Sequence, residues 1–293
     1  MLISIVIPIY NVEAYLRECL NSVMAQTYQD WECIMGDAAS TDGSLAIAEE
    51  FCRLDGRFRL ISLAENGGPS AARNVALDSI SGDLVAFIDA DDYVSNDFLE
   101  LGCQAIGDSD IVCFGFNGAK GKSEDYTGRE ALKTTLYQTV AELNPSFWGK
   151  IYTRRVIEGR RFTRGRIYED LELFVKIVQG VKQVRVVDKP VYFYRRHDDS
   201  TIHAWSHKRL DVLKVTEEIE TRFAEDTDLL RAARARRFAA NFNILLLLKK
   251  NGAGDSPEAD GCRRELMRLR RGVLMDSRAR MKDRIGALVA YMI

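Results

Sequence analysis

Apolar runs and amphipathic segments alternate along the first 115 residues of the chain. Short apolar runs are typical of buried strands, and apolar positions that recur every three to four residues are typical of helices. The runs predict strands at 3–7, 31–35, 58–62 and 84–88, and the periodic segments predict helices at 12–26, 44–54 and 70–79. Strands that are apolar on both faces belong to a parallel sheet covered by helices, so the pattern predicts an α/β fold with a mostly parallel sheet.

After residue 115 the pattern is less regular. Residues 118–128 are polar and rich in glycine, which indicates a loop or an excursion at the sheet edge. Residues 129–187 mix short helices with strand-like pieces, and further strands are expected at 183–188 and 191–195. Beyond residue 205 the chain is predicted to be helical, with the run Ile244–Leu248 buried and a helix end at 251–254. We therefore expect an α/β domain over 1–204, in halves 1–115 and 116–204, and a helical extension over 205–293.

Polar residues follow each predicted strand of the first half. Because ligands bind beyond the carboxyl ends of the strands in such sheets, these segments are expected to form one rim. They are Pro8–Asn11, Asp37–Asp42, Asn66–Arg73 and Asp89–Asp92.

The triplet Asp89-Ala90-Asp91 is the strongest candidate on this rim for a metal-binding site. Two carboxylates at positions i and i+2 of an extended segment project to the same side and repel each other unless a cation neutralises them. Such oxygen ligands suit Mg²⁺ or Mn²⁺, which take further ligands from substrate phosphates. The alternative is that Asp91 or Asp92 caps a helix that starts near Ser95, and spacing leaves both readings open.

Two other rim segments carry candidate binding residues. Asp37 ends a strand and could accept hydrogen bonds from a base or a ribose, whereas Asp42 or Ser44 is a plausible N-cap of the next helix. Arg73 lies one turn into the helix that follows a glycine turn. It could reach a base, a diphosphate or an acidic neighbour, although a segment of this kind, taken singly, is more often an ordinary helix start.

The distribution of charge along the chain bears on its possible partners. The chain has 41 Lys+Arg and 43 Asp+Glu, but from residue 261 onward nine basic residues face three acidic ones. A basic tail with apolar positions at Leu266, Leu269, Val273 and Leu274 and an apolar end suits an anionic membrane surface; packing on the catalytic domain or a dimer contact is the alternative. We expect no nucleic-acid partner.

The six cysteines include no CxxC pair and no zinc-ligand spacing with histidine, and Cys33 and Cys113 read as buried hydrophobes. The N-terminus resembles a strand rather than a signal peptide, and no apolar run approaches the ~18 residues of a spanning helix. These features predict a cytoplasmic protein, soluble or attached peripherally to the inner face of the membrane.

Five ordered motifs carry a resemblance to a known group. They are Ser4–Asn11, Gln26–Tyr28, Ser40–Ser44, Ser70–Asn74 and Phe87–Asp92, with weaker continuation at 148–152, 169–170 and 192–195. Together they resemble the inverting family 2 glycosyltransferases of the GT-A fold, whose sheet is Rossmann-like. The resemblance covers roughly residues 1–200, and it makes 1–115 the half that binds the nucleotide-sugar and 116–204 the acceptor side.

The resemblance implies a role for individual residues. Pro8, Tyr10 and Asp37 would line the nucleoside pocket, and Arg73, Asp89 and Ala90 would help to bind the nucleotide. Asp91 would bind the divalent metal, and Asp170 would be the general base. Contacts to phosphate or acceptor would come from Trp148, Lys150, Glu169, Arg195 and His197. From the residues alone, a role in stabilising the start of a helix is the more frequent one for Glu169 or Asp170, and Trp148 could be a core aromatic.

One departure from the family pattern leaves the donor open. The family usually carries Asp-Asp-Gly-Ser-Thr-Asp, and here the second Asp and the Gly are Ala38 and Ala39. The expected reaction moves a hexosyl or N-acetylhexosaminyl group from a nucleotide-sugar, expected to be a UDP-sugar, to a hydroxyl of a glycan or lipid-linked acceptor in bacterial cell-surface polysaccharide or glycolipid synthesis. The alternative is a binding or scaffold protein that keeps the fold without turnover.

Other nucleotide-binding classes fit poorly. A dehydrogenase needs a GxGxxG turn after the first strand, and a P-loop ending at Gly121-Lys122-Ser123 would need glycine at Phe116. A nucleotidyltransferase would need a Gly- and Arg-rich loop after the first strand, which is absent from the sequence.

Overall fold

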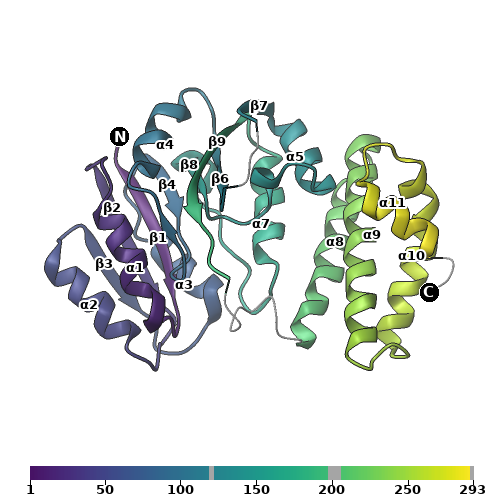
Figure 1. Cartoon of the computed structure of the whole chain (residues 1–293), viewed down its shortest axis with the longest axis horizontal. Coiled ribbons are helices and arrows are strands. Elements are labelled where there is room, and N and C mark those ends of the chain that lie inside the picture. Colours follow the sequence, from purple (N-terminus) through teal and green to yellow (C-terminus); the bar gives the residue numbers. More distant parts are fainter. Residues whose placement is uncertain (119–121, 197–205, 291–293) are drawn as a thin grey trace.

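The computed structural model describes residues 1–118, 122–196 and 206–290 (Figure 1). Within them, nine strands form one mixed sheet in the order β3-β2-β1-β4-β8-β6-β9-β5, and β7 pairs with β9 outside this path. The strands are β1 Ile3–Ile9, β2 Trp31–Asp37, β3 Phe58–Ser62, β4 Leu84–Phe87, β5 Tyr93–Val94, β6 Ile111–Phe116, β7 Glu124–Thr127, β8 Lys150–Thr153 and β9 Gln183–Phe193.

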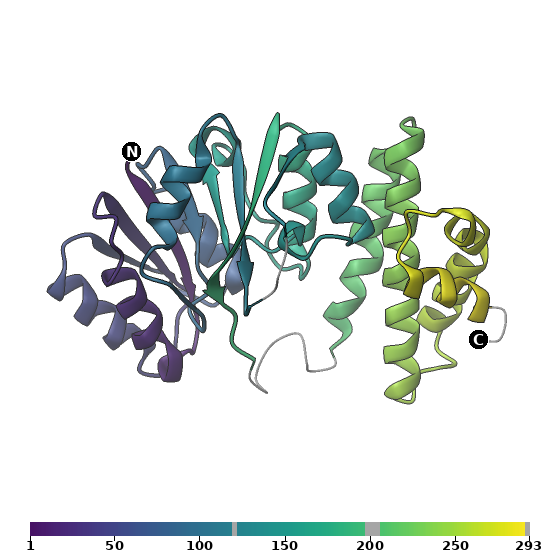
Figure 2. The same cartoon turned by 45° about the horizontal axis from the view of Figure 1, so that its top comes forward.

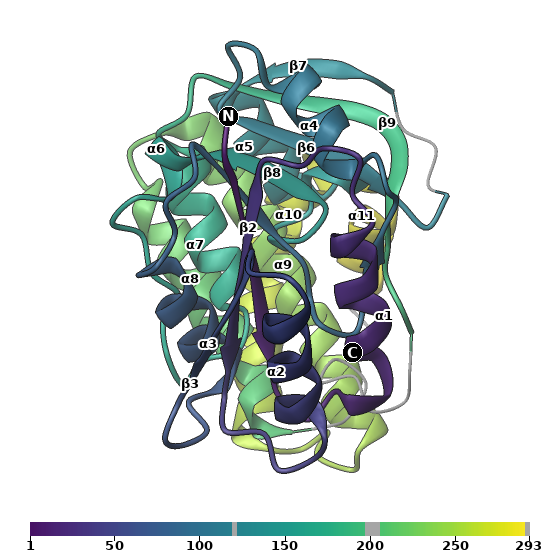
Figure 3. The same cartoon turned by 90° about the vertical axis from the view of Figure 1, so that its left-hand side faces the viewer.

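The first half is the predicted strand–helix alternation. Strands β1 to β4 are parallel, and the helices between them are α1 (Glu13–Met24), α2 (Ser44–Leu54) and α3 (Gly68–Leu77). Alternate residues of β1 enter opposite cores: Ile5 and Ile7 pack with α1 and α2, and Val6 packs with α3. Figure 3 shows α1 and α2 on one side of the strands and α3 and α7 on the other.

The second half breaks the parallel order. Strand β8 is antiparallel to both β4 and β6, and β5 and β7 are antiparallel to β9. The predicted edge excursion at 118–128 contains β7, and the two strands predicted at 183–188 and 191–195 are one continuous strand, β9. The helices between β4 and β9 are α4 Phe98–Ile106 in the first half, and α5 Gly128–Tyr137, α6 Arg154–Ile157 and α7 Glu169–Val178 in the second.

Four further helices stand beside the α5 and α7 side of the sheet (Figures 1 and 2). They are α8 Asp211–Arg222, α9 Thr227–Lys250, α10 Pro257–Met275 and α11 Met281–Val289. Helix α9 packs on α5 and α8 packs on α7, so Phe174 and Phe238 belong to one continuous apolar core. The expected boundary at 204/205 falls outside the described residues, and the division into two domains stays a prediction.

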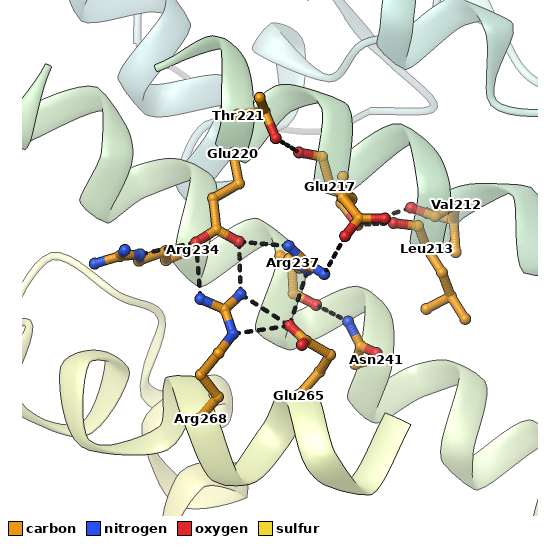
Figure 4. Close-up of polar contacts among 11 residues, drawn as sticks. Val212, Leu213, Glu217, Glu220, Thr221, Arg234, Arg237, Asn241, Glu265 and Arg268 are labelled. Carbon is orange, nitrogen blue, oxygen red and sulfur yellow. Dashed lines mark hydrogen bonds and ion pairs between the residues drawn. The ribbon is translucent and has the colours of Figure 1, made fainter. Parts of the chain in front are cut away.

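An ion-pair network ties α8, α9 and α10 together (Figure 4). The Glu220 carboxylate accepts hydrogen bonds from Arg234, Arg237 and Arg268 at 2.7–3.0 Å. Burial alone would raise the pKa of Glu220, but the hydrogen bonds from Arg268, Arg234 and Arg237 outweigh it and lower that pKa to about 2. The Glu220 carboxylate therefore links α8, α9 and α10 of the helical extension.

One prediction about the helices was too broad. Ile244, Leu245 and Leu248 are buried in α9, but Leu246 is 46% exposed. Successive residues turn by about 100° around a helix, so a run of five apolar residues cannot face one core. In α10, by contrast, Leu266, Leu269 and Val273 are buried as an inward stripe.

The cysteines and the helix compositions agree with ordinary core packing. Cys33 and Cys113 are fully buried, and all six cysteines are free thiols. Among the helices that the structure describes, none combines the length and the apolar character needed to cross a bilayer.

Candidate active site

The carboxyl ends of β1, β2 and β4 meet at one edge of the sheet. Ile9 is in register with Asp37, and Val6 with Phe87, so the segments that follow these strands emerge side by side. Gly36 decides how near α3 can approach. A Cβ at Gly36 would lie 2.2 Å from the carbonyl oxygen of Ala72, so only glycine lets α3 come this near β2. The next residue of α3 is Arg73, which therefore reaches this rim.

Arg73 joins two carboxylates from distant parts of the chain. Its guanidinium donates to Oδ1 of Asp89 at 3.0 Å and to Oε1 of Glu169 at 2.9 Å. All three side chains are largely shielded, with exposed fractions of 13%, 26% and 10% in that order. Of the three kinds of partner expected for Arg73 (a base, a diphosphate or an acidic neighbour), the structure shows acidic neighbours.

Asn74 explains why Glu169 is within reach. Its side chain donates to the carbonyl oxygen of Phe162 at 2.9 Å and accepts from the amide of Phe162 at 2.8 Å. This pair of hydrogen bonds fixes the segment that leads into α7, whose first residue is Glu169. The Ser70–Asn74 motif therefore positions the acidic start of α7 as well as Arg73.

The loop after β4 concentrates three carboxylates. Burial raises the pKa of Asp89, the Arg73 charge opposes that rise, and the Asp91 charge adds to it. Asp92 is buried, accepts from the hydroxyl of Tyr192 at 2.6 Å and from the amide of Arg195 at 2.8 Å, and has a pKa raised to about 8, first by burial and then by Asp89. Asp92 therefore anchors this loop to the end of β9.

The capping alternative for these aspartates is wrong. Helix α4 begins at Phe98 with Asp97 as its N-cap, so neither Asp91 nor Asp92 caps it. The side chain of Ala90 is 3% exposed, which leaves only its main chain able to face a ligand.

Hydrogen bonds hold the loop after β2 in place and join it to the segment after β1. Asp37 is buried and accepts from the amide and the hydroxyl of Ser40. The carboxylate of Asp42 accepts from the amides of Ser44 and Glu13, at the starts of α2 and α1. The N-cap residue of α2 is Gly43, so the prediction of Asp42 or Ser44 at that position was wrong by one residue, although Asp42 still satisfies the first helical amide.

The two alanines that depart from the family pattern occupy different environments. Ala38 is fully buried, whereas Ala39 adopts φ = +59°, the left-handed region that glycine favours. The backbone thus keeps the conformation that a glycine would adopt, although a methyl group is present.

The start of α7 supplies the candidate base. Tyr168 precedes it with φ = +64°, and Asp170 accepts from the amide of Leu171 at 2.7 Å. Burial raises the pKa of Asp170, while the charges of Arg73 and Arg236 oppose the rise. Arg236 belongs to α9, so the helical extension contributes a charge beside this acid. No sequence motif pointed to Arg236, because only tertiary packing brings α9 to α7.

The remaining predicted residues lie around the end of β9. Trp148 stacks on Tyr192 with ring centroids 4.8 Å apart and on Tyr194 at 5.5 Å. Lys150 is buried, donates to the carbonyl oxygen of Ser146 at 2.7 Å, and has a pKa lowered to about 8, first by burial. A direct acceptor contact by Lys150 stays a prediction.

Arg195 is also engaged with the protein. It donates to the carbonyl oxygen of Asp91 at 3.0 Å and to the carboxylate of Glu18 at 2.5 Å.

Pro8 lies in β1, and the ring of Tyr10, just beyond β1, is 42% exposed at the same rim. His197 lies outside the described residues.

The donor set at the rim fits a cation that is held partly by substrate. Among the described residues, no group of three histidines, cysteines or acids is arranged to hold a metal alone. Mg²⁺ and Mn²⁺ sites of nucleotide enzymes need only one or two carboxylates, because phosphates and water complete the shell. Asp91 would supply such a carboxylate, and a cation there would offset the negative charge of Asp91 beside Asp89.

Comparison with known proteins identifies the family of this chain. The family model described as "Glycosyl transferase family 2" matches residues 4–167. The chain belongs to glycosyl transferase family 2. It is 30% identical over 247 residues to the putative glycosyltransferase EpsH of Bacillus subtilis, and the aligned region covers 79% of this chain and 72% of EpsH. It is 33% identical over 229 residues to the glycosyltransferase GlyA of Streptococcus pneumoniae, covering 72% of this chain but only 33% of GlyA.

Solved structures support the fold. The structure of S. aureus TarS 1–349 in complex with UDP-GlcNAc matches with a TM-score of 0.73 at 22% identity, covering 100% of this chain and 88% of TarS 1–349. The mannosyltransferase PcManGT of Pyrobaculum calidifontis, in complex with GDP-Man and Mn²⁺, matches with a TM-score of 0.57 at 18% identity over 99% of this chain and 86% of that one. The predicted GT-A α/β fold with a helical C-terminal part is confirmed.

Proposed function

We propose that this family 2 protein is an inverting glycosyltransferase that moves a sugar from a nucleotide-sugar to an acceptor hydroxyl. The observation that carries the proposal is the arrangement at the rim, where Arg73 links Asp89 at the end of β4 to Glu169 at the start of α7. This link holds the loop expected to bind the donor beside the acid expected to activate the acceptor. A protein that only bound the donor would not need Asp170 in this place.

Each step of the reaction has a residue in a suitable position. Tyr10 and Asp37 hold the nucleoside at the ends of β1 and β2, and the loop of Asp89 holds the diphosphate side. Asp170 removes the proton of the acceptor hydroxyl, which attacks the anomeric carbon from the face opposite the diphosphate. The raised pKa of Asp170 makes it a stronger base than an ordinary aspartate.

A divalent cation on Asp91 would complete the donor site. Mn²⁺ or Mg²⁺ held there by Asp91 and the diphosphate would stabilise the negative charge that develops on the leaving group. Asp91→Ala should remove the effect of Mn²⁺ on donor affinity, whereas Asp97→Ala, which removes an acid at the α4 N-cap, should keep it. Equal Mn²⁺ dependence in both variants, measured by isothermal titration, would reject Asp91 as the ligand.

A UDP-sugar is the preferred donor in this proposal. TarS, whose fold this chain resembles, was solved with UDP-GlcNAc, and PcManGT with GDP-Man. Relatives named for teichuronic acid and poly(ribitol-phosphate) glycosylation support an acceptor from bacterial cell-surface polysaccharide or glycolipid synthesis, and a hexosyl or N-acetylhexosaminyl group as the sugar.

The test is a donor titration followed by a hydrolysis assay. UDP-GlcNAc, UDP-glucose and GDP-mannose are titrated into the full chain with and without Mn²⁺, and release of nucleoside diphosphate is then followed by mass spectrometry. We expect one UDP-sugar to bind in the presence of Mn²⁺ and to be turned over slowly by water. Binding without turnover for every donor, also with acceptor extracts, would favour the scaffold alternative.

Helix α11 motivates a proposal about location. Its residues Met281, Ile285, Leu288 and Val289 are 38–66% exposed and lie on one face, while Ala287 on the other face is buried. The segment from residue 261 carries nine basic and three acidic residues. An apolar face within a basic segment suits an anionic membrane, so we propose peripheral binding at the inner face of the cell membrane.

Vesicle flotation of the full chain tests this location. Wild type should float with phosphatidylcholine–phosphatidylglycerol vesicles and much less with pure phosphatidylcholine. The double variant Ile285→Glu/Leu288→Glu should lose flotation, whereas Leu54→Glu, which changes an exposed leucine at the end of α2, should keep it. A wild type that does not float, but forms a dimer that the double variant dissociates, would replace the membrane with a second copy of the chain.

A further inference from the structure

A cavity of about 210 Å³ lies between the helical extension and the start of α7. Its lining includes Tyr168 just before α7, Val212 of α8, and Arg236, Asn243 and Ile244 of α9. The volume is below the roughly 300–1,000 Å³ of sites for drug-sized ligands, so it suits one sugar ring or one phosphate group rather than a nucleotide.

Arg236 is an unusual member of this lining. No described residue forms a hydrogen bond or an ion pair with it, and its Nε atom is shielded from solvent without a partner. Its neighbours on α9 differ, because Arg234 and Arg237 both bind Glu220. A shielded N–H group without a partner costs free energy, so the packing of α9 alone does not explain why an arginine stands at position 236.

The charges around Arg236 leave it available for a ligand. Burial and then the charge of Arg280 lower the pKa of Arg236 to about 10, so the guanidinium stays protonated at neutral pH. The charges of Asp170 in α7, of Tyr168 just before α7 and of Asp283 in α11 favour the protonated form of Arg236, and Asp283 is paired with Arg280.

We propose that Arg236 binds an anionic group, a phosphate or a carboxylate, of the acceptor. The inference rests on the proposed function, because it takes Asp170 as the base that the acceptor hydroxyl must reach. Tyr168 lines the cavity and stands two residues before Asp170, so an acceptor whose hydroxyl meets Asp170 lies beside this cavity. An anionic acceptor would be repelled by Asp170 alone, and the planar fork of Arg236 offsets that repulsion.

Titration of small anions into the metal-free full chain tests the site. The probes are inorganic phosphate and methyl glucuronide, with methyl glucoside as the neutral comparison, and binding is followed by calorimetry and by ³¹P line broadening. We expect Arg236→Gln to weaken binding of at least one anion by about 10-fold or more, since a hydrogen bond to a charged group contributes about 1.5–3 kcal/mol. The glucoside should bind the two proteins alike.

Two further variants control for charge and folding. Arg231→Gln removes one exposed positive charge from the same helix and should bind anions as wild type does. Arg236→Lys keeps the charge but not the fork, and should bind phosphate with intermediate affinity. If Arg236→Gln is folded by circular dichroism and binds both anions as wild type does, the proposal is wrong; if it does not fold, Arg236→Lys decides in the same way.

The outcome is separable from that of the proposed function. Donor binding is measured on the same proteins, and Arg236→Gln should keep it because the cavity lies outside the rim of Asp89 and Asp91. A wild type that binds phosphate through Arg236 but binds no nucleotide-sugar would reject the proposed function and leave an anion site. The preferred anion distinguishes a phosphate-bearing acceptor from one with a uronic acid.

Discussion

Arg73 and Asp89 form an ion pair of 3.0 Å that joins the first turns of α3 to the end of β4. The same guanidinium reaches Glu169 on α7, 96 positions later in the chain. One arginine therefore keeps the two halves of the proposed site in a single arrangement, and its removal would leave two shielded carboxylates without their counter-ion.

Arg73→Gln should lower the free energy of unfolding by about 3 kcal/mol, because breaking a shielded pair leaves uncompensated charge. Urea denaturation at neutral pH measures the change. The control is Arg17→Gln, which breaks the exposed pair with Glu50 and should lower the free energy of unfolding much less, because solvent screens that pair. Equal losses in the two variants would mean that Arg73 has no special structural role.

Asp170→Asn should lower kcat at least ~10²-fold while donor affinity stays close to that of wild type, because an amide cannot accept the proton. Because burial raises the pKa of Asp170, the base is protonated at a higher pH than an ordinary aspartate. As the pH is lowered, the kcat of wild type should therefore begin to fall at a higher pH than it would if the base were an exposed aspartate. Turnover near the wild-type rate in the variant would identify another base.

Ala39→Gly should raise the free energy of unfolding by up to about 1 kcal/mol, because glycine adopts φ = +59° without the strain that a Cβ brings. Ala38→Gly is the matched comparison. Ala38 is fully buried and has no positive φ, so its substitution should destabilise the protein by about 1 kcal/mol. Thermal melts of both variants give the comparison, and a loss of stability in Ala39→Gly would show that the methyl group has a packing role.

Glu220→Gln should destabilise the chain by about 2 kcal/mol at neutral pH, since three arginines lose their shared counter-charge. The folded-state pKa of Glu220 is lowered to about 2, so its stabilisation is present above the ordinary value near 4.5 and is lost as the pH falls toward 2. The difference between wild type and variant should shrink over that window in urea titrations. Glu225→Gln, which changes an exposed acid nearby, should show no such dependence.

Local pattern was enough for much of the first half. The helix over 44–54 and the strand over 58–62 end where predicted, because apolar period and turn residues define both locally. The rim followed from the same alternation, since parallel strands bring their carboxyl ends together. The antiparallel β8 and the union of two predicted strands in β9 were not foreseen, because strand direction and continuity depend on pairing between distant segments.

The sequence by itself determined the alternation of strands and helices, the family motifs and the acidic residues of the rim, since these depend on residue type and short spacing. Only the tertiary structure decided the partners: Arg73 with Glu169, Asp92 with Tyr192, and Arg236 of α9 near Asp170. These side chains are 66–100 positions apart in the chain. Their meeting depends on how the helices pack on the sheet, which no local pattern encodes.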